Sequence, residues 1–151
     1  MTRRQSIPEQ WLIMNEPLRR EAWSALRRVP RGAGVFIFDE AGRLPLRELR
    51  NVARRRQLTI AAEASGATAR VHNARELRMA LLQRTPLILL SPIHETESHP
   101  DWCPLPRMRA ATLARLGHRR LIALGGMNRQ RYAKIAQLGF IGWAGISAFR
   151  T

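Results

Sequence analysis

The feature that most constrains this chain is a regular alternation of short apolar runs with longer amphipathic stretches. Six of seven runs are mainly apolar, which is typical of strands buried on both sides of a parallel sheet, and the seventh, at residues 69–72, is a brief strand that contains Arg70 and His72. The seven runs occupy residues 11–14, 34–38, 58–62, 69–72, 87–90, 121–124 and 140–146. Between most of them lie stretches with helical spacing, and Asn73 with Glu76 forms a predicted capping box at the start of one. The alternation predicts an α/β fold in which helices cover a parallel sheet.

One connection is too short for this pattern. Only residues 63–68 lie between the third apolar run and the fourth, and the four residues 64–67 cannot hold a helix. A parallel crossover needs about a dozen residues or more. Either the two strands form a hairpin, or a βα unit is lost and the chain crosses a gap. The sequence shows no linker or low-complexity segment, so we expect a single domain over residues 1–151.

The net charge of the chain limits the kinds of partner that it is expected to bind. Lysine and arginine number 26 against 11 acidic residues, a net charge of +15, which favours nucleic acid, an acidic membrane surface or phosphorylated small molecules. The arginines are dispersed, and Trp11 and Trp143 fall in predicted core strands, so nucleic acid is the least favoured. No apolar run approaches the ~20 residues of a membrane helix, and no signal peptide is recognisable. We expect a cytoplasmic protein that binds no membrane, and the lone Cys103 excludes an internal disulfide.

Ligands of parallel α/β folds bind beyond the carboxyl ends of the strands, so polar residues there are candidates. Gly125 and Gly126 lie between a strand and a helix, where backbone N–H groups and the helix N-terminus attract an anion. Thr96 and Ser98 alternate after the fifth strand and suit hydrogen bonds to phosphate oxygens, and His99 adds a further charge. These residues predict a phosphate site; the alternatives are a tight glycine turn and a solvated loop.

Carboxylates and histidines also follow the strands. Glu16, Asp39 and Glu63 come after the first three strands and could converge on a magnesium ion, although such residues also cap helices and pair with arginine. His72 and His94 are candidate catalytic acid–base groups, with polar rim residues as the alternative. Three further strand-end residues are candidate ligand-binding groups: Asn15, Ser91 and Ser147.

Three ordered motifs resemble the thiamine-phosphate synthase/TenI superfamily. Residues 91–100 resemble its segment in which a threonine and a second threonine or serine bind a thiazole phosphate. Residues 121–127 resemble its glycine-pair turn, and residues 142–147 resemble its last strand, which ends in a serine near the same phosphate. The resemblance implies an incomplete TIM-type (β/α) barrel with about seven mostly parallel strands. It implies phosphate binding by Thr96, Ser98, Gly125, Gly126 and Ser147.

The chain also departs from this family. The missing βα unit falls after Glu63, where the family has a strand followed by a metal-binding aspartate. Arg70 stands where the family has a serine, and His99 where it has a lysine. Pro92 stands where the tautomerase branch has a histidine, and the short helix that usually follows the last strand is expected to be missing. The thiazole-phosphate half of the site thus resembles the family, whereas the pyrimidine-pyrophosphate half looks eroded.

The resemblance implies a thiamine-biosynthesis protein that binds a thiazole phosphate and couples it to a pyrimidine pyrophosphate. Magnesium would stabilise the released pyrophosphate in that transferase reaction. Because the pyrimidine-pyrophosphate half lacks residues of the family, a second possibility is a catalytically inactive protein, either a sensor of a phosphorylated ligand or a partner subunit. An incomplete barrel exposes sheet edges, which a second copy in a homo-oligomer could cover. A third, a nucleic-acid-binding protein, rests on the net charge alone.

Overall fold

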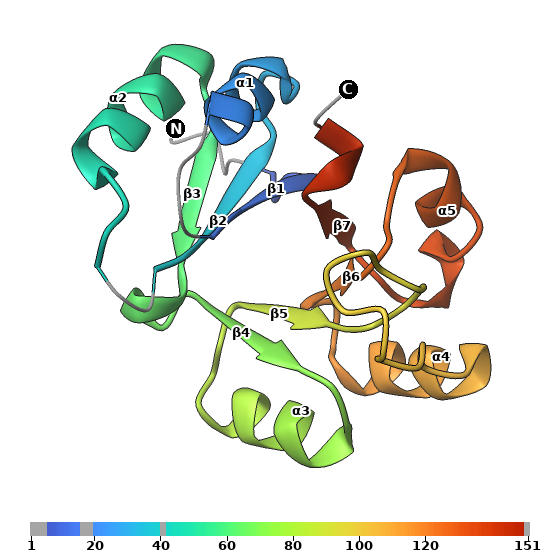
Figure 1. The fold of residues 1–151 in the computed structure, drawn as a ribbon. Helices are drawn as coiled ribbons and strands as arrows, with labels where there is room; N and C mark the ends of the chain where they lie inside the picture. The colour runs from blue at the N-terminus through green and yellow to red at the C-terminus, as the bar shows by residue number, and fades with distance from the viewer. Residues whose placement is uncertain (1–5, 16–19, 40–41, 150–151) are drawn as a thin grey trace.

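Seven parallel strands and the helices between them make up the described chain, a computed structural model covering residues 6–15, 20–39 and 42–149 (Figure 1). The strands are β1 (Gln10–Asn15), β2 (Gly34–Phe38), β3 (Thr59–Ala62), β4 (Thr68–Val71), β5 (Leu87–Leu90), β6 (Leu121–Leu124) and β7 (Gly142–Gly145). The α-helices are α1 (Arg20–Arg28), α2 (Leu46–Arg56), α3 (Ala74–Leu82), α4 (Arg107–Leu116) and α5 (Arg129–Ala133). Three single-turn 3₁₀ helices are η1 (Glu63–Ser65), η2 (Ala136–Leu138) and η3 (Ser147–Phe149).

The strand order shows how the sheet closes. The order is β3-β2-β1-β7-β6-β5-β4, so the first and last strands pair at the centre, and every recorded pairing is parallel. The sheet curls into a nearly closed TIM-like barrel with helices outside (Figure 1). β3 and β4 follow each other in the chain but lie at opposite ends of the sheet, joined through η1. We call the opening between them the seam; it matches the lost βα unit and rules out the hairpin.

Two apolar clusters hold the barrel, because successive side chains of a strand point to opposite faces. The larger cluster lies between the sheet and the helices, and the smaller fills the barrel interior. Inside, Trp11 of β1 stacks on Phe36 of β2 with ring centroids 4.2 Å apart. A Cβ at Gly34 would lie 2.0 Å from the Trp11 ring, so the sequence has no side chain there. The interior cluster forms the floor beneath the strand ends.

Local chemistry confirms the predicted start of α3. The Asn73 side chain accepts a hydrogen bond from the backbone N–H of Glu76 at 2.9 Å, as a capping box requires. The Glu76 carboxylate in turn accepts the backbone N–H of His72 at 2.7 Å. His72 therefore lies just past the end of β4, fixed to the first turn of the helix.

The end of the chain differs from expectation. The sequence predicts one helix from Asn128 to Gly139, but α5 ends at Ala133 and η2 follows after Ile135, which has a non-helical φ of −122°. The expectation that no short helix follows the last strand is wrong, because Ser147 begins η3. In the described ranges, no helix has the length and apolar character needed to cross a membrane.

Candidate functional site

A cavity of about 820 Å³ opens at the carboxyl ends of the strands, the position at which parallel barrels bind ligands. Ile13, Phe38 and Leu124 from the interior strands contribute apolar wall. Most of the polar residues that the sequence singled out line it: Asn15, Glu63, His72, Ser91, Thr96, Ser98, His99, Gly125, Gly126 and Ser147. The predicted phosphate residues therefore come together in one cavity, although they belong to three separate segments of the chain.

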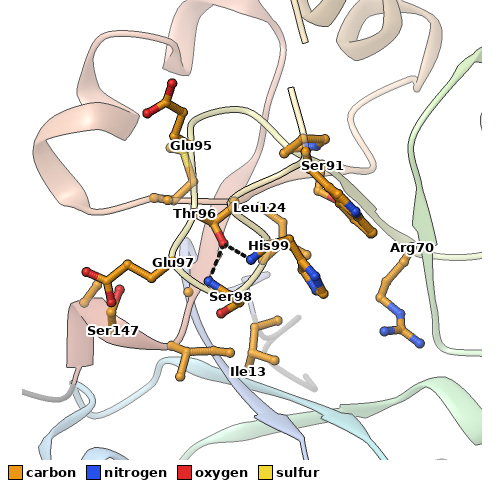
Figure 2. A pocket seen from close by; sticks show the side chains of 18 of the residues that line it. Ile13, Arg70, Ser91, Glu95, Thr96, Glu97, Ser98, His99, Leu124 and Ser147 are labelled. Carbon is orange, nitrogen blue, oxygen red and sulfur yellow. Dashed lines mark hydrogen bonds between the residues drawn. The ribbon is translucent and has the colours of Figure 1, made fainter. Parts of the chain in front are cut away.

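Thr96 and Ser98 lie on the loop after β5 and line the cavity, near the middle of the view in Figure 2. The Thr96 hydroxyl oxygen accepts the backbone N–H of Ser98 at 3.0 Å and that of His99 at 3.3 Å. These bonds fix a tight turn and leave the hydroxyl proton to be donated. Glu95 and Glu97 flank the turn, and their carboxylates point away from Thr96 (Figure 2).

The glycine pair packs directly against this loop. Gly125 and Gly126 have φ values of +101° and +57°, in the left-handed region that glycine tolerates. A Cβ at Gly126 would lie 2.2 Å from the carbonyl oxygen of Glu95. The Gly125 carbonyl accepts the backbone N–H of His94 at 3.1 Å. These contacts place the two glycines beside the threonine loop, in a backbone conformation that glycine tolerates.

The two histidine candidates have different surroundings. His72 lines the cavity, and its Nδ1 lies 3.0 Å from Glu76 Oε2. Partial burial alone would raise the pKa of Glu76, but hydrogen bonds from His72 and Asn73 outweigh it and lower that pKa. His94 is not among the residues that line the cavity. Burial lowers the pKa of His94, and the positive charges of Arg131 and Lys134 lower it further. The structure therefore places His72, but not His94, where a cavity ligand can reach it.

The carboxylates proposed for magnesium do not gather. Glu16 lies outside the described residues, and the Asp39 carboxylate accepts the backbone N–H groups of Arg43 and Leu44 at 2.8 and 3.1 Å. Glu63 does line the cavity, but both of its oxygens accept N–H groups of the Arg70 guanidinium. Within the ranges that the structure describes, no group of three or more His, Cys, Asp or Glu side chains could hold a metal. These residues do not fit the metal site that the resemblance implies.

The prediction of site residues missed several residues of the cavity wall, among them two arginines and a tryptophan. Arg70 and Arg131 bring positive charge to the wall, and Trp102 brings an exposed aromatic ring. Trp102 stacks on His99 at 4.3 Å between centroids and meets the ring of His72 edge-on at 5.2 Å. Sequence signals could have identified two of these residues: Arg70 is a charged residue within a strand, and Trp102 lies in a proline-rich loop after a strand.

Comparison with known proteins supports the fold. The sequence matches no protein-family model and no curated protein. Among solved structures, it is similar to a thiamine phosphate pyrophosphorylase from Pyrococcus furiosus, with a TM-score of 0.70 and 16% sequence identity. The match covers 93% of this chain and 86% of that chain. This chain therefore has the barrel fold of a thiamine phosphate pyrophosphorylase, in a divergent form and in agreement with the resemblance of its sequence motifs.

Proposed function

We propose that the protein binds a phosphorylated thiazole in the strand-end cavity. The hydroxyls of Thr96, Ser98 and Ser147 and the backbone of Gly125 and Gly126 would hold the phosphate. The observation that carries this proposal is that all five residues line one cavity, although they come from three separate segments of the chain. Hydroxyl and backbone N–H donors are the groups that bind phosphate oxygens in proteins.

The rest of the cavity suits a small heteroaromatic ester. Arg70 and Arg131 bring positive charge to the wall, but four carboxylates also line it: Glu63, Glu76, Glu95 and Glu97. The proposed phosphate site therefore depends on hydroxyl and backbone donors rather than on the charge of the cavity. Phe38 and Trp102 supply apolar and aromatic surface for a ring. A cavity of about 820 Å³ lies within the range usual for small-molecule sites.

The reaction proposed for the cavity is the coupling of the thiazole phosphate to a pyrimidine pyrophosphate, with release of pyrophosphate. The name of the similar structure, a thiamine phosphate pyrophosphorylase, supports this transferase reaction. The ion pair between Glu63 and Arg70 favours a second candidate, a sensor that binds the thiazole phosphate without turnover. Thiamine phosphate formation from both substrates distinguishes the enzyme from the sensor.

Calorimetric titration with thiazole phosphate tests the site. Thr96→Ala and Ser98→Ala each remove one hydroxyl, and we expect each to weaken binding by about ten- to a hundredfold, since hydrogen bonds to charged groups contribute about 1.5–3 kcal/mol. Thr112→Ala is the matched control, because Thr112 lies on α4 and its hydroxyl bonds the Met108 carbonyl. Equal affinity in the wild type and in both cavity variants would refute the site.

A further inference from the structure

An arginine–glutamate pair occupies the wall of the cavity beside the seam. Arg70 pairs with Leu89 across the β4–β5 ladder, and Leu89 belongs to the interior cluster, so Arg70 is on the inward face of the barrel. Its Nε donates to Glu63 Oε1 at 3.2 Å, and its Nη2 donates to Glu63 Oε2 at 3.0 Å. This is the two-pronged geometry in which a guanidinium binds a carboxylate most specifically.

The same guanidinium also reaches β2. The Arg70 Cζ atom lies 4.4 Å from the centroid of the Phe38 ring, in a cation–π contact. Arg70 thus joins β4, η1 and β2 across the seam, where the usual βα unit is missing. The pair remains in contact with solvent, since the side chains of Arg70 and Glu63 are 37% and 32% exposed.

The pair changes the electrostatics of this end of the cavity. Magnesium needs carboxylate oxygens in a near-octahedral arrangement. Here both oxygens of Glu63 accept from a guanidinium, which stays protonated at any physiological pH. A divalent cation beside Glu63 would have to displace this partner and would meet its positive charge. Figure 2 shows Arg70 on the opposite side of the view from Ser147, with the loop of Thr96 and Ser98 between them.

We infer that the cavity takes its phosphorylated ligand without a divalent metal, and that Arg70 supplies the fixed positive charge at the seam. The ligand class that follows is a free phosphate monoester rather than a magnesium–pyrophosphate complex, so the inference favours the sensor over the transferase as the function of this cavity. The identity of the monoester rests on the proposed function, whereas the absence of a metal requirement rests on the Arg70–Glu63 pair. Different experiments therefore test the two claims.

A manganese titration followed by electron paramagnetic resonance tests the metal claim with or without a ligand. Mn²⁺ replaces Mg²⁺ as the probe, and inorganic phosphate is added in a second series. We expect the wild type and Glu63→Gln to bind Mn²⁺ equally weakly in both series, because Glu63 is engaged by Arg70. A manganese site in the wild type that Glu63→Gln abolishes would overturn the inference.

Thiazole phosphate binding measured in EDTA and in excess Mg²⁺ tests the role of Arg70. We expect wild-type affinities within about twofold of each other, and a loss of about three- to tenfold in Arg70→Gln, the size of one screened charge interaction. Arg70→Lys keeps the charge and should retain most of the affinity. Arg78→Gln on the exposed face of α3 is the matched control and should bind as the wild type does.

The outcomes separate the two proposals. Binding that disappears in EDTA, or an Arg70→Gln variant that is folded by thermal melting and binds as the wild type does, contradicts the inference and leaves the thiazole site intact. Failure of thiazole phosphate to bind under either condition refutes the proposed function. In that case the manganese comparison between the wild type and Glu63→Gln still decides the metal claim.

Discussion

Gly126 determines the shape of the cavity wall at the scale of a single residue. Its φ of +57° is strained for any side chain, and a Cβ would lie 2.2 Å from the Glu95 carbonyl oxygen. We expect Gly126→Ala to lower the free energy of unfolding by about 2–4 kcal/mol, combining backbone strain with overpacking. Gly66→Ala is the matched control, because Gly66 has a φ of +73° but nothing within 4 Å of a Cβ. Urea denaturation should show about 1 kcal/mol for Gly66→Ala; equal losses would contradict the close approach to Glu95.

The pH dependence of stability should depend on His94. Burial and the charges of Arg131 and Lys134 lower the pKa of His94 in the folded state. The unfolded chain, with an ordinary pKa of about 6.5, therefore takes up the proton first as the pH falls. The stabilising effect of a neutral His94 is fully present above pH ~6.5 and is lost as the pH falls through the folded pKa. Thermal melts between pH 7.5 and 5 should show a smaller decrease of Tm for His94→Gln than for the wild type; parallel curves would contradict this assignment.

Single residues also show the limit of reading the site from sequence. The sequence predicted that the glycine pair, Thr96 and Ser98 lie at the strand ends, and all four line the cavity. Their motifs are local, so their positions do not depend on how the strands are arranged. The same reasoning placed His94 at the site, but His94 does not line the cavity. Two residues of loop are enough to turn a side chain away from it. Arg70 was noticed only as a departure, because its role depends on a seam that no local pattern describes.

At the scale of elements, two N-caps allow a test of whether a cap stabilises a long helix more than a short one. Asn73 caps the nine-residue α3 by accepting the Glu76 N–H, and Asn128 caps the five-residue α5 by accepting the Arg131 N–H. We expect Asn73→Ala to destabilise the protein by about 1 kcal/mol, the usual cost of a lost N-cap. Asn128→Ala should cost less, because α5 has fewer aligned peptide dipoles and a shorter helix to stabilise. Chemical denaturation of both variants decides the order; a larger loss for Asn128→Ala would contradict it.

The strands were the most predictable elements. Apolar runs identify six of the seven, because a parallel sheet inside a layer of helices buries both faces, whereas β4 carries Arg70 and was predicted only as a brief strand. The helix after β6 was predicted as one piece, because Tyr132, Ile135 and Ala136 have helical spacing. The structure divides it, with the N–H of Lys134 and that of Ile135 bonded to carbonyls three residues earlier. Local packing produces the 3₁₀ turns and the break at Ile135. The spacing of apolar residues is similar in a 3₁₀ turn and in an α-helix, so the sequence pattern does not distinguish them.

For the whole molecule, the missing βα unit predicts an uneven pattern of stability. In the described sheet, β3 pairs only with β2 and β4 only with β5, whereas β1 pairs with both β2 and β7. An edge strand has one ladder of hydrogen bonds and opens at lower free energy than a central strand. Amide hydrogen exchange should therefore be faster in residues 59–62 and 68–71 than in residues 10–15. Arg70→Gln removes the pair that spans the seam, so it should speed exchange further in β4 and leave β6 unchanged. Equal protection of β1 and β4 in the wild type, with a dimer in sedimentation, would instead mean that a second copy covers the seam.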